Sequence, residues 1–171
     1  MDSALYKKFG AFGIDFHPYN VNPYPESDRK PQLELHFLPR RSGHGELGSQ
    51  DPIENEAILQ ARKNDMKNLL EFVKNEYPEI EFLATYTWLQ NKANYRILFP
   101  SDVEMKLVRD KFSGLWGQFM KWDGSASLQT YNQFLEKLKE AKTMEEVFDA
   151  IPMKVLGTTI PLEKMYKLYS L

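Results

Sequence analysis

The chain of 171 residues contains no cysteine. Without thiols there can be no disulfide framework, no thiolate nucleophile and no cysteine zinc site. The sequence also lacks an apolar run of about 18 residues, the length that a membrane-spanning helix needs. The N-terminus has neither the apolar core nor the small-residue cleavage site of a signal peptide. We therefore expect a cytoplasmic protein that does not associate with a membrane.

Neither sign of charge is in excess, since 22 Lys and Arg residues face 24 Asp and Glu residues. No segment holds a run of about five or six like charges. This balance gives no electrostatic reason to expect nucleic acid or an anionic membrane as a partner. Familiar catalytic motifs are missing too: a phosphate-binding loop, a dinucleotide-binding glycine pattern, a nucleophile elbow and a zinc-binding H-E-x-x-H. The sequence thus identifies no cofactor, and whether the protein is an enzyme stays open.

What is present is the composition of an ordinary globular protein, with 42% hydrophobic and 27% charged residues. The length suits one domain. We predict a single domain over residues 1–171, of the α/β or α+β class, with a mixed sheet of four to five strands and packed helices. Residues 4–16, interrupted by Gly10 and Gly13, fit either a short helix or an edge strand.

The clearest elements are a strand, a helix and a second strand in that order. Residues 32–38 alternate between apolar and polar side chains, which is typical of a strand with one buried face. Pro52 suits the first position of a long amphipathic helix that ends at residue 77, with Leu70 and Val73 on its buried side. Residues 82–89 are β-branched, aromatic or aliphatic, as in a central strand. A right-handed crossover would make the two strands parallel.

Weaker patterns cover the second half of the chain. We predict a helix over residues 102–111, a strand over 115–120, a helix over 128–141 and a strand over 153–156. Thr143 and Glu146 have the spacing of a capping box that opens a short helix. Pro161 is expected to start the last helix.

The three histidines, His17, His36 and His44, all lie within the first 44 residues of the chain. Glu34 precedes His36 on the same strand face, about 6.5–7 Å along the strand. A carboxylate near an imidazole holds its tautomer and raises its basicity, as a general base requires. We predict His36 and Glu34 as the catalytic pair; the alternative is that both lie on the solvated face of a strand. The histidine spacing matches no ligand pattern, so no metal site is predicted.

A second group of functional candidates follows the central strand. Arg96 could hold a carboxylate or phosphate, and Trp88 could form an apolar wall for a ligand. The predicted ligand-binding residues are Arg96, Trp88, Asn91, Arg40, Arg41 and Gln118. The alternative makes Trp88 part of the core, Asn91 a helix cap, Arg96 an exposed residue or ion-pair partner, and Gln118 an ordinary polar residue.

One stretch resembles a pattern in a group of proteins. Trp88-Leu89-Gln90-Asn91, followed by Tyr95-Arg96-Ile97-Leu98-Phe99-Pro100, resembles Trp-Leu-x-Asn and then Tyr-Arg-x-Leu-Phe-Pro in small uncharacterised bacterial proteins. Residues 115–119, Leu-Trp-Gly-Gln-Phe, and the closing aromatic segment are similar too. The resemblance implies a bacterial or phage source and a shared pocket or core, and it implies no activity.

Two functions fit these observations. The first is a small transferase or hydrolase that binds an anionic small molecule at the sheet edge and uses His36 as base. Parallel strands would bring His36, the loop with Arg40 and Arg41, Trp88 and Arg96 to one edge, around a cavity of about 300–1,000 Å³. The second is a non-catalytic module, a bacterial or phage effector or regulator, that binds another protein.

Overall fold

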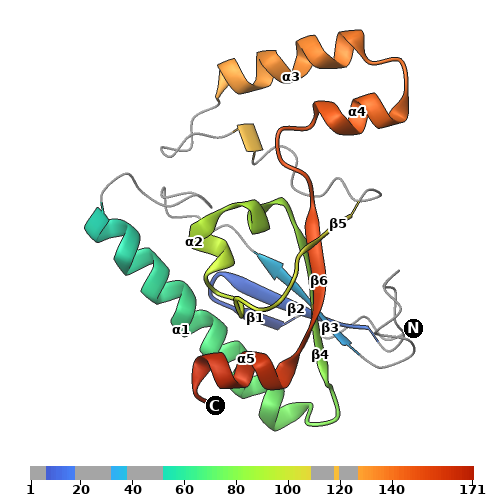
Figure 1. The fold of residues 1–171 in the computed structure, drawn as a ribbon. Coiled ribbons are helices and arrows are strands. Elements are labelled where there is room, and N and C mark those ends of the chain that lie inside the picture. The colour runs from blue at the N-terminus through green and yellow to red at the C-terminus, as the bar shows by residue number, and fades with distance from the viewer. Residues whose placement is uncertain (1–6, 18–31, 38–51, 109–117, 120–126) are drawn as a thin grey trace.

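A computed structural model describes residues 7–17, 32–37, 52–108, 118–119 and 127–171. Within them the chain forms one mixed sheet in the order β1-β2-β3-β4-β6-β5 (Figure 1). The strands are β1 Lys7–Phe9, β2 Phe12–His17, β3 Gln32–Phe37, β4 Phe82–Thr87, β5 Lys106–Leu107 and β6 Leu156–Pro161. The predicted α/β class is confirmed, although the sheet has six strands rather than four or five.

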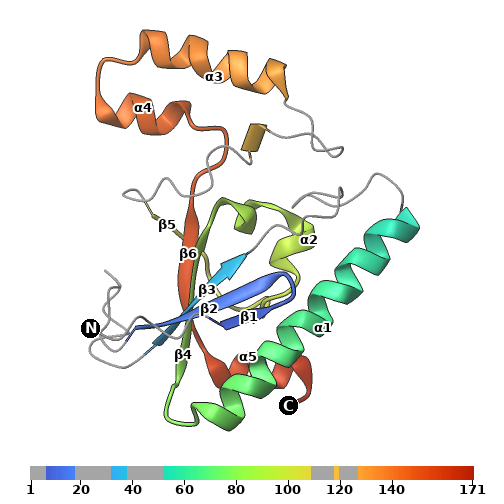
Figure 2. The same ribbon diagram turned by 180° about the vertical axis from the view of Figure 1, so that it is seen from behind.

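Five α helices and the 3-10 turn η2 accompany the sheet in the described ranges, together with a short 3-10 turn at residues 118–119. They are α1 Pro52–Glu76, η2 Trp88–Asn91, α2 Ala93–Arg96, α3 Leu128–Glu140, α4 Met144–Ala150 and α5 Leu162–Tyr169. Helices α1, α2 and α5 lie on one side of the sheet, which we call the inner face (Figures 1 and 2). The opposite side is the outer face. The α3–α4 hairpin stands apart, beyond the end of β4.

The pair β3–β4 is parallel, as the crossover predicted, and its register runs from Gln32↔Phe82 to Leu35↔Thr85. The remaining pairs, β1–β2, β2–β3, β4–β6 and β5–β6, are antiparallel. Helix α1 therefore carries the chain over the inner face from one central strand to the next. At the far edge, Val108 N–H donates to Val155 O at 3.0 Å, just where the chain leaves β5 and returns towards β6.

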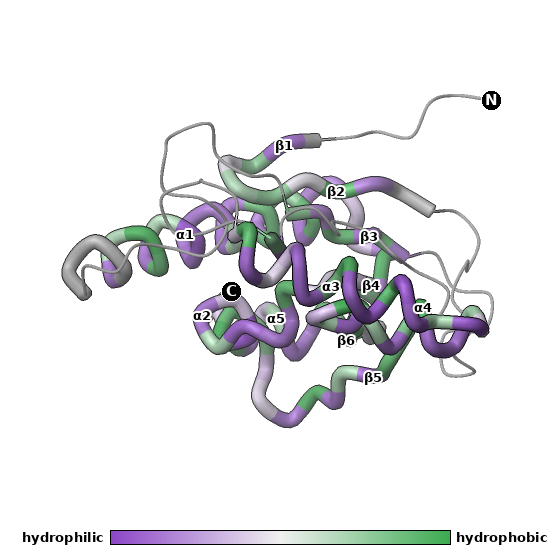
Figure 3. Tube along the Cα trace, turned by 90° about the horizontal axis from the view of Figure 1, so that it is seen from above, coloured by the Kyte–Doolittle hydropathy of each residue, from purple (hydrophilic) through white to green (hydrophobic). Residues whose placement is uncertain are grey.

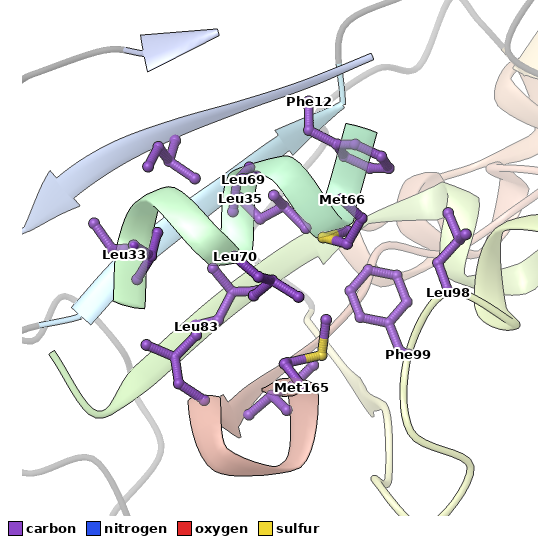
Figure 4. Packing of buried hydrophobic residues seen from close by; sticks show 14 of the residues in the cluster. Phe12, Leu33, Leu35, Met66, Leu69, Leu70, Leu83, Leu98, Phe99 and Met165 are labelled. Carbon is purple, nitrogen blue, oxygen red and sulfur yellow. The ribbon is translucent and has the colours of Figure 1, made fainter. Parts of the chain in front are cut away.

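The main core lies between the inner face and α1 and α5 (Figure 4). Leu70 and Val73 are 0% exposed, so their predicted burial is confirmed. They pack in one cluster whose members include Leu33, Leu35, Met66, Leu69, Leu83, Leu98, Phe99 and Met165. Alternation along β3 places Leu33 and Leu35 in this core and turns Glu34 and His36 to the outer face.

The N-terminal segment, which fitted a helix or a strand, is a β hairpin. Gly10 sits in its turn with φ 55°, a left-handed conformation that favours glycine. The next amide, Ala11 N–H, donates to Asp65 Oδ2 of α1 at 3.0 Å. A Cβ on Gly10 would collide with the Asp65 carboxyl group. The hairpin turn is therefore fixed against α1.

Several predicted elements in the second half are wrong or displaced. Residues 102–108 contain no helix; Lys106 and Leu107 form β5 and pair with Gly157 and Leu156. Residues 118–119 form a 3-10 turn rather than the predicted strand, whose other residues lie outside the described ranges. The strand predicted at 153–156 begins only at Leu156. Helices α3, α4 and α5 are confirmed, and Thr143 and Glu146 form the predicted capping box.

Candidate functional site

His36 lies near the end of β3 on the outer face, and its Nε2 is 2.9 Å from Asp15 Oδ2. The two side chains are 37% and 28% exposed, so solvent reaches both. Asp15 belongs to β2, where it stands opposite Glu34, while Gly13 stands opposite His36. The carboxylate in contact with the imidazole thus comes from the neighbouring strand. At this distance the carboxylate forms an ion pair when the imidazole is protonated, and it can hold the orientation of the ring.

The parallel strands β3 and β4 separate beside His36. The β3–β4 register ends at Leu35↔Thr85. Strand β3 continues to Phe37, paired with Phe12 of β2. Strand β4 continues to Thr87, paired with Leu156 of β6. Figure 2 shows the two strands spreading towards their C-terminal ends. We call the residues beyond the last pair, His36, Phe37, Tyr86 and Thr87, the open end.

The two residues that directly follow the last pair, His36 and Tyr86, both lie on the outer face because side chains alternate along each strand. Tyr86 stands opposite Gly157 of β6. A Cβ on Gly157 would collide with the Tyr86 ring and lie 2.7 Å from Thr85 O. Glycine at this position lets the Tyr86 ring lie close over β6. The outer side of the open end therefore carries the His36 imidazole from one strand and the Tyr86 ring from the other, with the Tyr86 hydroxyl oxygen buried.

The inner side of the open end is packed with aromatic rings. The Phe37 ring is 5.4 Å from the Tyr95 ring of α2, in edge-to-face geometry. The Tyr95 ring is in turn 5.4 Å from that of Phe99. Tyr95 is 1% exposed. A ligand at the open end would consequently enter from the outer face or the sheet edge.

Arg96 is not brought together with His36. Its Nη1 donates to Phe99 O at 3.4 Å and to Pro100 O at 3.0 Å, and its Nη2 donates to Val103 O at 2.6 Å. Burial lowers the pKa of Arg96, and the nearby Asp102 carboxylate opposes that shift. Helix α2 packs on the inner face, whereas His36 lies on the outer face. Three of the five N–H donors of the Arg96 guanidinium group bind the chain's own backbone. Ligand binding by Arg96 stays a prediction.

Asn91 is not a helix N-cap, so that interpretation is wrong. It is the last residue of η2, and its Nδ2 donates to Trp88 O at 2.7 Å and to Lys154 O at 2.8 Å. The N-cap of η2 is Thr87, whose side chain accepts from Leu89 N–H, and the N-cap of α2 is Lys92. Trp88 itself is 2% exposed and belongs to the main core.

The Gln118 side-chain amide makes two hydrogen bonds with the backbone of one residue, Met153, in the segment before β6. Its Nε2 donates to Met153 O at 3.0 Å, and Met153 N–H donates to its Oε1 at 2.8 Å. Asn91 and Gln118 thus hold consecutive residues, Met153 and Lys154. Asn91 is 63 residues away from Lys154 in the sequence, and Gln118 is 35 residues away from Met153. No local sequence pattern can reveal contacts between residues so far apart. Direct ligand binding by either residue stays a prediction.

The remaining candidates fall outside this description. Arg40, Arg41 and His44 lie beyond the described ranges. In the part of the chain that the structure describes, no group of three His, Cys, Asp or Glu side chains is arranged to hold a metal ion. None of the described helices has the length and apolar character needed to cross a membrane.

The sequence reasoning missed Asp15 and Tyr86. Asp15 lies in the segment whose strand or helix character was open, so its partner could not be inferred. Tyr86 was placed correctly in a strand, but its significance depends on where the β3–β4 pairing ends. Knowledge of how β2 pairs with β3 would have shown that Asp15 lies next to His36.

Comparison with known proteins adds little to this picture. No family model and no curated protein matches the chain. Among solved structures, the chain is similar to an acyltransferase crystallised in complex with decanoyl-CoA, at 15% sequence identity and a TM-score of 0.41. The match covers 92% of this chain and 46% of that protein. The matched part of this chain therefore spans less than half the length of that acyltransferase.

Proposed function

We propose that this protein is a small transferase that takes an acyl group from an anionic thioester of the coenzyme A type, bound at the open end, with His36 as general base. The observation that carries the proposal is the end of pairing at Leu35↔Thr85, directly before His36 and Tyr86. Beyond that pair the β3–β4 register ends, while β3 goes on pairing with β2 and β4 with β6. An extended ligand with amide groups can bond to a strand edge as an added strand does.

The pantetheine arm of coenzyme A suits such a place because it is narrow, unbranched and carries two amide groups. Its thioester would lie near the strand ends, where backbone N–H groups can stabilise the negative charge that develops on the carbonyl oxygen. His36 would take a proton from the attacking amine or hydroxyl of the acceptor. A C–N or C–O bond forms, the C–S bond breaks, and the leaving thiolate takes up a proton. Asp15 would hold the imidazole in position throughout.

The phosphates of the donor need positive charge nearby. Arg40 and Arg41 follow Phe37 within a few residues of chain, each of which spans at most about 3.6 Å. In this proposal they bind the phosphate groups, in keeping with the anionic ligand that the sequence predicted. Arg side chains suit phosphate because their N–H donors match its oxygens in pairs.

Calorimetric titration with coenzyme A tests the binding step, and thiol release from acetyl-CoA with a panel of small amines tests the transfer. We expect His36→Ala to bind coenzyme A normally and to lose about 10²- to 10⁴-fold in rate. Asp15→Asn should slow the reaction more than Glu34→Gln, because Asp15 is the residue in contact with the imidazole. Thiol release that needs no amine would indicate a hydrolase instead.

Absence of coenzyme A binding at millimolar concentration would contradict the proposal. The alternative, a non-catalytic module that binds another protein, would then be the better interpretation. A His36→Ala variant with an unchanged transfer rate would contradict only the role of His36.

A further inference from the structure

The α3–α4 hairpin has a hydrophobic cluster of its own. Its buried members are Phe119, Phe134, Phe148, Ala150 and Ile151, with Tyr131 and Leu138 packed against them, and none of these belongs to the main core. Helices α3 and α4 contact each other more than they contact any other described element. A unit with few contacts to the rest of a protein can move at a small cost in free energy.

The described polar contacts between the hairpin and the sheet are concentrated in the short segment before β6. The Lys154 ammonium group donates to Phe148 O and to Ile151 O, both at the end of α4. The backbone of Met153 is held by Gln118, and that of Lys154 by Asn91. Asn91 follows β4 within one 3-10 turn. The hairpin's attachment is therefore coupled to the strand that forms one side of the open end.

The hairpin also lies on the side of the sheet to which β3 and β4 point. In Figure 1 it stands beyond the end of β4, and Figure 3, seen along that direction, shows α3 and α4 in front of the strand ends. Leu156, the first residue of β6, pairs with Thr87 at the open end. The chain thus passes from α4 to the open end within a few residues.

We infer that the α3–α4 hairpin is a cover for the open end and that Asn91 and Gln118 are positioning residues that set its place. This inference rests on the proposed function. In this inference the hairpin has two arrangements, one closed over the open end and one displaced from it. A ligand that contacts both the strand ends and the hairpin binds the closed arrangement more tightly. It therefore increases the population of that arrangement, by an amount set by the difference between its two affinities. Without the amide contacts at Met153 and Lys154, the hairpin would sample more orientations, and the ligand would have to select among them.

Hydrogen exchange of the full chain, with and without coenzyme A, tests this inference. We expect coenzyme A to slow exchange in α3 and α4 as well as in the last residues of β3 and β4. In Gln118→Ala and Asn91→Ala, hairpin amides should exchange faster without ligand, while those of α1 and β3 stay unchanged. Both variants should bind coenzyme A more weakly by about tenfold, the factor that 1.4 kcal/mol represents.

Matched controls are Gln133→Ala and Asn132→Ala, which remove the same side chains from exposed positions on α3. They should leave both exchange and affinity unchanged. Coenzyme A that binds without slowing exchange in α3 and α4 would overturn the cover and leave the proposed function standing. Unchanged exchange and affinity in Gln118→Ala and Asn91→Ala would overturn their positioning role. Absence of coenzyme A binding would overturn this inference together with the proposed function.

Discussion

The main core and the hairpin cluster are built from similar amphipathic sequence, yet they are stabilised differently. The main core draws on β2, β3, β4 and β6 and on helices α1, α2 and α5, and many of its side chains are 0% exposed. The hairpin cluster draws mainly on two short helices, and its Phe134 is 9% exposed. The hairpin cluster has far fewer buried side chains than the main core, so apolar burial stabilises it less. The hairpin therefore depends more on local features such as its capping box.

Leu70→Ala should produce the largest effect, because it leaves a cavity at the centre of the main core. We expect the free energy of unfolding to fall by about 2–5 kcal/mol. Denaturant unfolding followed by circular dichroism measures it. Leu168→Ala, at a position 45% exposed on α5, is the matched control and should cost much less. Equal losses in both variants would mean that α1 does not anchor the core.

Phe148→Ala tests whether the hairpin unfolds by itself. Loss of this ring, 5% exposed, should reduce the hairpin's local stability by about 2 kcal/mol or more, given the cost of Phe→Ala in buried sites. We expect exchange to accelerate in α3 and α4 only, with the main unfolding transition almost unmoved. A shift of that transition as large as the one for Leu70→Ala would show that the two regions unfold as one unit.

Thr143→Ala removes the capping side chain at the start of α4. Thr143 Oγ1 accepts from Glu146 N–H at 3.2 Å, and loss of such a cap costs about 0.5–2 kcal/mol. Exchange rates in the first turn of α4 should rise. Thr143→Ser, which keeps the hydroxyl group, should restore most of the protection; if it does not, the hydroxyl group is not what stabilises the turn.

Acid should weaken the hairpin before it weakens the main core. Backbone N–H groups of Lys142 and Thr143 donate to the Glu146 carboxylate and lower its pKa from the ordinary value of 4.5. A lowered folded-state pKa means that this stabilisation is complete above the unfolded value and is lost as pH falls through the folded value. Exchange in α4, measured from pH 6 downwards, should rise below about pH 4.5 relative to α1. Glu146→Gln should abolish that pH dependence; an unchanged profile would contradict the assignment.

The sequence predicted best where the signal is local or strictly periodic. Pro52 and the spacing of Leu70 and Val73 located α1, and Thr143 with Glu146 located the start of α4. Alternation in β3 placed His36 on its correct face. The parallel pair followed because a single long helix between two strands permits few other topologies.

The prediction failed where a partner lies far away in the sequence. A helix was predicted over residues 102–111, yet Lys106 and Leu107 extend to pair with β6. Asn91 was expected to bind a nearby amide, but one of its two acceptors is Lys154 O. The partner of His36 is Asp15 because β2 and β3 share a register that no single strand encodes. Tertiary pairing decides such cases over local preference.

The hydrogen bond from Val108 N–H to Val155 O has a consequence for how this chain could be altered. This bond brings Val108 and Val155 together at the sheet edge, although many residues separate them in the sequence. A short turn between Val108 and Val155 would keep the strand order intact, since closing a smaller loop costs less entropy. We therefore expect that the segment between Val108 and Val155, with α3 and α4, can be replaced by another sequence while the sheet keeps its strand order.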